Sequence, residues 1–194
     1  MTDPSFDSIF MRRLRYLLTP QWDIYISLKD RLKGATVLEI GSGTGSGTLL
    51  YASEAKSVDA IELDRHAVQF ASEMFPAKNI RWICTDICHW YTSERYDYAV
   101  AIETLEHIRN WYAALRNIHE FLAPGGYFIM SARNANSDLR RWKDLHEREL
   151  TARQLVSSLG EFFPEVHLYD YSLTLEQDED TRMTPLVAVA RKGP

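Results

Sequence analysis

Four of the chain's nine glycines lie in one seven-residue run, Gly41–Gly47, which follows an apolar stretch. A ligand that must touch the backbone needs glycine, because a Cβ would hold it away from the peptide groups. A carboxylate, Glu39, comes two residues before the run. The run therefore predicts a ligand-binding loop, and the alternative is a tight turn between a strand and a helix.

The spacing of these glycines narrows the class of ligand. The dinucleotide fingerprint G-x-G-x-x-G fails, because Ser46 or Thr48 stands where its last glycine must be. A phosphate-binding P-loop also fails, since no Gly-Lys-Ser/Thr follows. What remains is E-x-G-x-G-x-G, which begins at Glu39. A carboxylate there would repel a pyrophosphate but suits an amino group and a sulfonium charge, which favours S-adenosylmethionine over NAD.

Acidic residues follow the next two predicted strands. Glu62 comes 21 positions after Gly41, where an acid can accept both hydroxyls of a ribose. Asp64 is the competing residue for this role, and its alternative is a solvated helix cap. Asp86 can accept the amino group of adenine while Ile87 packs on the ring, or it is a turn residue that ends the strand.

Five segments in this order resemble the class I S-adenosylmethionine-dependent methyltransferases: VLEIGSGTGSGT, AIELD, CTDI, YDYAVAIETLEHI and LAPGGYFIMSARN. The resemblance runs from about Thr36 to Asn134 and continues more weakly to the C-terminus. It implies a Rossmann-like α/β fold: a seven-stranded, mostly parallel sheet with an antiparallel last strand and helices on both faces. It also implies an S-adenosylmethionine pocket lined by Glu39, Gly41, Ser42, Gly43, Gly45, Glu62, Leu63, Asp86, Ile87 and Glu103.

The acceptor is expected at the end of the fourth strand, because ligands lie at the carboxyl ends of parallel strands. The residues there are Glu103-Thr104-Leu105-Glu106-His107, without the Asn/Asp-Pro-Pro-Tyr/Phe run or the Pro-Cys pair typical of DNA-methylating enzymes. We take Glu103, His107 and His146 as candidate catalytic residues. A general base is needed only where the acceptor must lose a proton.

This E-x-x-E-H run resembles ubiquinone-type O-methyltransferases and small-RNA 3′-end methyltransferases, whose Glu and His residues can hold a divalent cation. Glu103, Glu106 and His107 would then be ligands, with His146 a further one. The alternative is that Glu106 is solvated, and we assign no metal. Cys84, Cys88 and His89 lack an evident fourth ligand for zinc.

The segment HERELTARQL also resembles the small-molecule O-methyltransferase branch, in which it approaches the acceptor. The preceding basic residues and Trp142 could bind an anionic or aromatic acceptor, or form a solvated helix edge. Arg12, Arg13 and Arg15 could likewise belong to a lid or to the wet side of a first helix.

Hydrophobic periodicity predicts the elements that must position these residues. The predicted strands are Thr36–Ile40, Ser57–Leu63, Ile80–Cys84, Tyr96–Ile102, Tyr127–Ser131, Glu165–Leu173 and Pro185–Arg191. Helices alternate with the first five, which indicates a parallel sheet covered on both faces. The last two strands have only an acidic connection between them, Leu175–Thr184, so one of them should be antiparallel. A helix from Thr151 should begin with a capping box closed by Gln154.

Length and composition are those of one globular domain. With 194 residues we expect a single methyltransferase domain, in which 1–34 form a helical lid and 35–194 the core. A net charge of -5 makes nucleic acid an unlikely partner, and no apolar run reaches the ~20 residues of a membrane span. The first residues do not resemble a signal peptide, and two cysteines form no disulfide framework, so we expect a cytoplasmic protein.

The sequence thus predicts transfer of a methyl group to an oxygen or nitrogen of a small molecule, with oxygen preferred. A nucleic-acid end or nucleotide as acceptor, with a metal at the E-x-x-E-H run, is the second hypothesis. A catalytically silent subunit that keeps the fold is the third.

Overall fold

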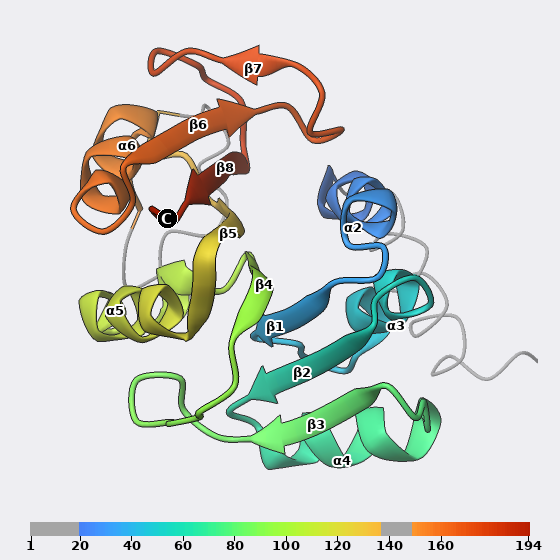
Figure 1. The fold of residues 1–194 in the computed structure, drawn as a ribbon. Helices are drawn as coiled ribbons and strands as arrows, with labels where there is room; N and C mark the ends of the chain where they lie inside the picture. Colours follow the sequence, from blue (N-terminus) through green and yellow to red (C-terminus); the bar gives the residue numbers. More distant parts are fainter. Residues whose placement is uncertain (1–19, 137–148) are drawn as a thin grey trace, which may run out of the picture.

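The computed structural model describes residues 20–136 and 149–194 (Figure 1). Within these ranges one sheet has eight strands in the order β3-β2-β1-β4-β5-β8-β6-β7. The strands are β1 (Thr36–Ile40), β2 (Ser57–Glu62), β3 (Ile80–Cys84), β4 (Tyr96–Ile102), β5 (Leu122–Ala132), β6 (Glu165–Tyr169), β7 (Glu176–Gln177) and β8 (Leu186–Arg191). All seven predicted strands are present.

The direction of the strands agrees with the predicted α/β fold. Strands β1 to β5 run parallel to one another, whereas β8 runs antiparallel to both of its neighbours, β5 and β6. The eighth strand, β7, is a two-residue segment of the acidic connection, and it pairs with β6. Two residues are too few to produce a periodic pattern, and the sequence therefore predicted seven strands.

Strand β5 begins earlier than predicted. The strand was predicted to begin at Tyr127, but β5 starts at Leu122 and includes the Pro124-Gly125-Gly126 run. The pairing with β4 is irregular there: Tyr96 pairs with Leu122, and Tyr98 pairs with Tyr127. The extra residues of β5 bulge between these two pairs.

Helices cover both faces of the sheet (Figure 1). They are α2 (Pro20–Arg31), α3 (Ser46–Ala52), α4 (Arg65–Met74), the 3-10 turn η1 (Leu105–His107), α5 (Trp111–Phe121) and α6 (Ala152–Gly160). One buried cluster joins α2 and α3 to the sheet, and a second joins α5 and α6. The predicted capping box of Thr151 and Gln154 is confirmed at the start of α6. The predicted first helix lies outside the described residues.

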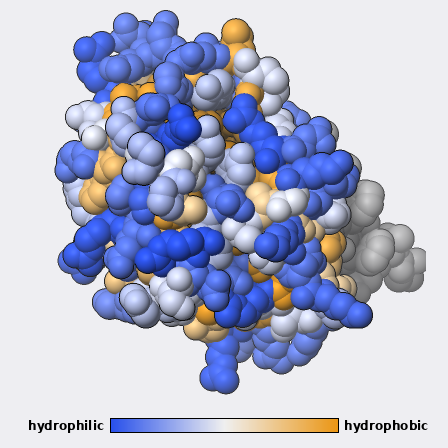
Figure 2. Space-filling model, viewed as in Figure 1, coloured by the Kyte–Doolittle hydropathy of each residue, from blue (hydrophilic) through white to orange (hydrophobic). Residues whose placement is uncertain are grey.

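The surface seen in Figure 2 is mostly hydrophilic, with hydrophobic residues in small separate areas. Among the residues that the structure describes, none of the helices combines the length and the apolar character that crossing a bilayer requires.

Candidate functional site

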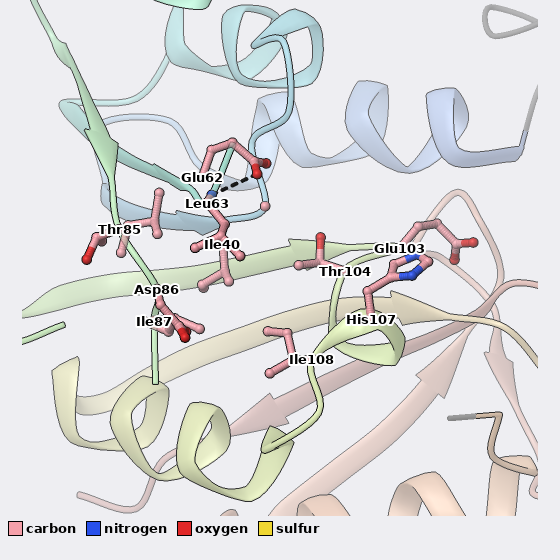
Figure 3. Close-up of a pocket in the computed structure, with 12 residues that line it drawn as sticks. Ile40, Glu62, Leu63, Thr85, Asp86, Ile87, Glu103, Thr104, His107 and Ile108 are labelled. Carbon is pink, nitrogen blue, oxygen red and sulfur yellow. Dashed lines mark hydrogen bonds between the residues drawn. The ribbon is translucent and has the colours of Figure 1, made fainter. Parts of the chain in front are cut away.

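Two adjoining cavities lie where β1, β2, β3 and β4 end. The first, of about 290 Å³, is lined by Glu62, Asp86 and His107 among others (Figure 3). The second, of about 270 Å³, lies between the glycine loop and α2. Gly41, Glu103 and Thr104 line both cavities, so the two are neighbours across these residues. Their position at the carboxyl ends of parallel strands is the one predicted.

The glycine loop contains two kinds of glycine. Gly41 has φ 75°, and a Cβ built on it would lie 2.3 Å from Oγ1 of Thr104, so the fold itself requires glycine there. Gly45 is similar, since a Cβ would lie 2.5 Å from the ring of Trp82. Gly43 differs, because a Cβ would meet nothing within 4 Å and would project from a residue that lines the second cavity. The space beside Gly43 is therefore open, and a contact of Gly43 with a ligand stays a prediction.

Glu62 lines the first cavity and also holds the loop in place. Its Oε2 accepts a hydrogen bond from the peptide N of Gly43 at 2.9 Å. Its Oε1 accepts from the N atoms of Leu63 at 2.7 Å and Asp64 at 3.0 Å. A carboxylate offers about four acceptor positions, so room remains for a hydroxyl of a ligand. Ribose binding by Glu62 stays a prediction, and the structure adds its contact with the loop.

The competing residue, Asp64, caps α4. Its Oδ1 accepts a hydrogen bond from the N of His66 at 2.8 Å, and its side chain is exposed. This is the helix-cap alternative considered from the sequence. Asp64 is absent from the described residues that line the two cavities.

Asp86 and Ile87 line the first cavity at the end opposite Glu103 and His107 (Figure 3). Asp86 also ends its strand as a turn residue, since Oδ1 accepts from the N of Cys88 at 2.8 Å. Partial burial acts to raise the pKa of Asp86, but hydrogen bonds from Cys88 and His89 lower it below its ordinary value. The lowered pKa favours the ionised carboxylate, whose two oxygens can accept a hydrogen bond from an amino group. Ile87 is 3% exposed and forms an apolar wall beside it.

Glu39 is buried beneath the loop and is not among the described residues that line the two cavities. Thr48 of α3 donates a hydrogen bond to its Oε2. Burial raises the pKa of Glu39 to about 7, although the hydroxyls of Thr48 and Tyr51 act to lower it. In the structure Glu39 supports the loop from below; a direct contact with the ligand's amino group stays a prediction.

Glu103 and His107 lie side by side at the near end of the first cavity (Figure 3). The peptide N of Glu103 donates to the carbonyl of Ser131 at 3.1 Å, and its Oε1 accepts from Oγ of Ser131 at 3.0 Å. Glu103 has φ 50°, a left-handed conformation that is uncommon for a residue with a Cβ. Burial raises the pKa of Glu103, while Ser131, Gln21, His107 and Arg133 lower it in part.

Glu106 is separated from Glu103 and His107, although all three belong to the E-x-x-E-H run. It is 4% exposed, which overturns the solvated alternative, and it lines a small cavity of about 10 Å³ together with Trp111 and Arg133. Among the residues that the structure describes, no three His, Cys, Asp or Glu side chains gather as a metal site would require. Glu106 and His107 are kept apart by the 3-10 turn η1, which directs Glu106 into the core and His107 outward.

The buried carboxyl of Glu106 predicts an unusual dependence of stability on pH. Burial, and next the charge of Glu103, raise its pKa from an ordinary 4.5 to about 8. Between these values the unfolded chain has lost the proton and the folded chain keeps it. Stability present below pH 4.5 is therefore lost as pH rises to 8, at about 1.4 kcal/mol per pH unit for one group. Glu39 contributes in the same direction up to pH 7.

We expect Glu106→Gln to melt at a higher temperature than the unchanged protein at pH 8 and to lose less stability between pH 5 and pH 8. The measurement is thermal melting without ligand across that range. Glu94→Gln, which alters an exposed glutamate, should follow the unchanged protein. Parallel curves for Glu106→Gln and the unchanged protein would show that Glu106 does not retain its proton on folding.

Among the lining residues that were not predicted as site residues, two come from the distant helix α2. Gln21 and Tyr25 of α2 line the second cavity, where Tyr25 packs against the loop so closely that a Cβ on Gly47 would lie 2.3 Å from its ring. Both residues lie in the segment 1–34 that was expected to be a helical lid, but the sequence held no signal that this helix covers the loop. His146, the third predicted catalytic residue, lies outside the described residues, as do Trp142 and the neighbouring basic residues.

The family profile described as a methyltransferase domain matches residues 12–171. A curated (S)-coclaurine N-methyltransferase from Papaver somniferum is 26% identical over 113 residues, which are 56% of this chain and 32% of that protein. A ubiquinone biosynthesis O-methyltransferase from Coxiella burnetii is 27% identical over 124 residues, which are 62% of this chain and 53% of that protein. The chain thus spans about half the length of these relatives or less.

Solved structures with the same fold cover most of the chain. The N-methyltransferase NodS from Bradyrhizobium japonicum WM9, in complex with S-adenosyl-L-homocysteine, gives a TM-score of 0.67 at 24% identity, covering 90% of this chain and 86% of that one. A Haloferax volcanii complex between the Trm112 methyltransferase activator and a putative methyltransferase gives a TM-score of 0.75 at 14% identity, covering 100% of both chains. At these identities the likeness concerns the fold.

Proposed function

Since this chain belongs to the class I S-adenosylmethionine-dependent methyltransferases, we propose that it transfers the methyl group to an oxygen or nitrogen atom of a small-molecule acceptor. The observation that carries the proposal is the acidic charge of the site. Glu62, Asp86 and Glu103 would repel the phosphates of a nucleic acid.

The residues of the site fit the donor. Glu62, Asp86 and Ile87 line the first cavity and would hold the ribose and adenine of S-adenosylmethionine there. Ser42 and Gly43 of the loop line the second cavity and would hold the amino-acid end of S-adenosylmethionine there. A Cβ on Gly43 would occupy the open space beside the loop. When bound, S-adenosylmethionine supplies an electrophilic methyl group on a sulfonium.

The chain's own contribution to the reaction is alignment and control of a proton. Because Gly41, Glu103 and Thr104 join the two cavities, they border the place where the reacting atoms meet. Holding two reactants in line there supplies much of the rate. Glu103 and His107 are the two described titratable groups beside it that can take a proton from the acceptor (Figure 3).

Transfer of a trideuteriomethyl group from labelled S-adenosylmethionine tests this proposal. The protein is incubated with a cell extract separated into small molecules, RNA and protein, and each fraction is examined by mass spectrometry. We expect the label in the small-molecule fraction. Label confined to RNA and lost with a chelator would favour the nucleic-acid hypothesis, and failure to bind S-adenosylhomocysteine would favour a silent subunit.

We expect His107→Ala to lower turnover about 100-fold, the low end for loss of a general acid or base, while the affinity for S-adenosylhomocysteine changes less than about threefold. His107 is exposed at the edge of the first cavity, beside Glu103 rather than beside the adenosine residues. Turnover is measured as transfer of the trideuteriomethyl group to the small-molecule fraction, and affinity is measured by calorimetry. His66→Ala, at the exposed start of α4, is the matched control. Equal losses of turnover and affinity would exclude an acid–base role.

A further inference from the structure

The walls of the two cavities carry charge of one sign. Glu62, Asp86 and Glu103 line them, whereas no Lys or Arg does so among the residues described. Arg133 lies close enough to Glu103 to lower its pKa, but it forms an ion pair with Glu149, Nε to Oε1 at 3.4 Å. The acids of these described walls attract positive charge and repel negative charge.

Of these acids, Glu103 is the one placed at the reacting centre. Glu62 and Asp86 border only the first cavity, but Glu103 borders both, next to the Gly41 and Thr104 that the cavities share. Its main chain and carboxylate are both tied to Ser131, at 3.0 Å from Oγ to Oε1. A left-handed φ of 50° is uncommon in a residue with a Cβ, so the surrounding structure holds the side chain in this direction.

We propose that the acceptor atom is the nitrogen of an amine, and that the carboxylate of Glu103 binds this amine and takes up its proton. The inference rests on the proposed small-molecule methyl transfer and narrows its acceptor from oxygen or nitrogen to nitrogen.

The movement of charge in the reaction explains the preference. The nitrogen lone pair forms the new N–C bond as the C–S bond breaks, and the electron pair of that bond goes to sulfur. Positive charge thus passes from sulfur to nitrogen, and a fixed carboxylate beside the nitrogen stabilises it as it develops. A phenol would have to lose its proton first, and a carboxylate neighbour makes the resulting anion less stable.

The proton also has a route out of the site. The methylated nitrogen carries one proton more than the neutral amine product, and Glu103 accepts it. His107 stands beside Glu103 and is exposed (Figure 3), so it can pass the proton to solvent. Burial raises the pKa of Glu103, which makes its carboxylate a better proton acceptor than an exposed one.

Three ligands separate an amine-binding carboxylate from one that serves the cofactor. S-adenosylhomocysteine is neutral at sulfur, S-adenosylmethionine is a sulfonium, and sinefungin carries an amine at the position of the transferred methyl. All three keep the α-amino group and the adenosine. Calorimetry is performed with the unchanged protein, with Glu103→Gln, and with Glu94→Gln as an exposed control.

We expect the unchanged protein and Glu94→Gln to bind sinefungin at least about 10-fold more tightly than S-adenosylhomocysteine, which is about 1.4 kcal/mol, and more tightly than S-adenosylmethionine. In Glu103→Gln this preference should fall below about threefold, while S-adenosylhomocysteine keeps its affinity. The ratio in the unchanged protein is a test in itself, whatever the stability of the variant.

Three results would overturn the proposal. Equal affinity for sinefungin and S-adenosylhomocysteine in the unchanged protein would show that no group there binds an amine. If the unchanged protein bound S-adenosylmethionine as tightly as sinefungin, Glu103 would serve the sulfonium of the donor. If Glu103→Gln lost the same affinity for all three ligands, Glu103 would bind their shared α-amino group. In the labelling experiment, the CD3 group must lie on nitrogen; CD3 on oxygen contradicts the amine. Label found only in macromolecules would instead reject the proposed function.

Discussion

A valine in place of Gly43 is expected to weaken the binding of S-adenosylhomocysteine more than about 100-fold, or about 2.8 kcal/mol, and to leave the fold intact. Gly43 lines the second cavity, and a Cβ on it would meet no protein atom within 4 Å. The added side chain therefore displaces ligand rather than protein. The measurements are calorimetry for affinity and thermal melting for the fold.

Gly34→Val is the matched control for this prediction. Gly34 has φ 70° against 53° for Gly43, and a Cβ on it also meets nothing within 4 Å, but it lies in the turn between α2 and β1. Both variants incur the strain of a left-handed β-branched residue, and only Gly43→Val should lose the ligand. If both kept their affinity, the cofactor would have to lie elsewhere.

Removal of the Glu62 carboxylate is expected to weaken S-adenosylhomocysteine binding about 100-fold, because a hydrogen bond to a charged group contributes about 1.5–3 kcal/mol. Two losses combine in Glu62→Ala. The ribose would lose its acceptor, and the peptide N of Gly43 would lose the carboxylate that positions the loop, at 2.9 Å. Calorimetry gives the affinity.

Asp64→Ala is the control for Glu62→Ala, because it removes a neighbouring acid that is not expected to bind the ribose. Asp64 caps α4 through the N of His66, so this variant should lose about 1 kcal/mol of folding stability and keep its affinity. An unchanged affinity in Glu62→Ala together with a reduced one in Asp64→Ala would reverse the assignment of the ribose contact.

The fold was predictable because its signals are local. Strands β1 and β4 follow from apolar runs within a few residues, and both have the predicted bounds. The capping box at Thr151 is likewise a contact between neighbours in sequence. β7 and the bulged start of β5 were missed, because two-residue pairing and a register irregularity depend on the partner strand.

The site was predictable only in part. The sequence identified Glu62, Asp86 and Glu103 as residues at strand ends, and all three line the first cavity. It placed Glu39 in the same pocket, but the structure buries it below the loop, bonded to Thr48. It also treated Glu106 as a partner of Glu103 or as solvated, and the structure places it in a separate small cavity.

By itself, the sequence determined the class of donor. The glycines and acids that distinguish this donor lie in short, contiguous segments, so their types and spacing can be read without the fold. Tertiary structure decided which side chains face the reacting centre. One 3-10 turn sends Glu106 inward and leaves His107 at the cavity, and α2 supplies Gln21 from a distant segment. Such choices depend on packing between elements far apart in the chain, where no local pattern records them.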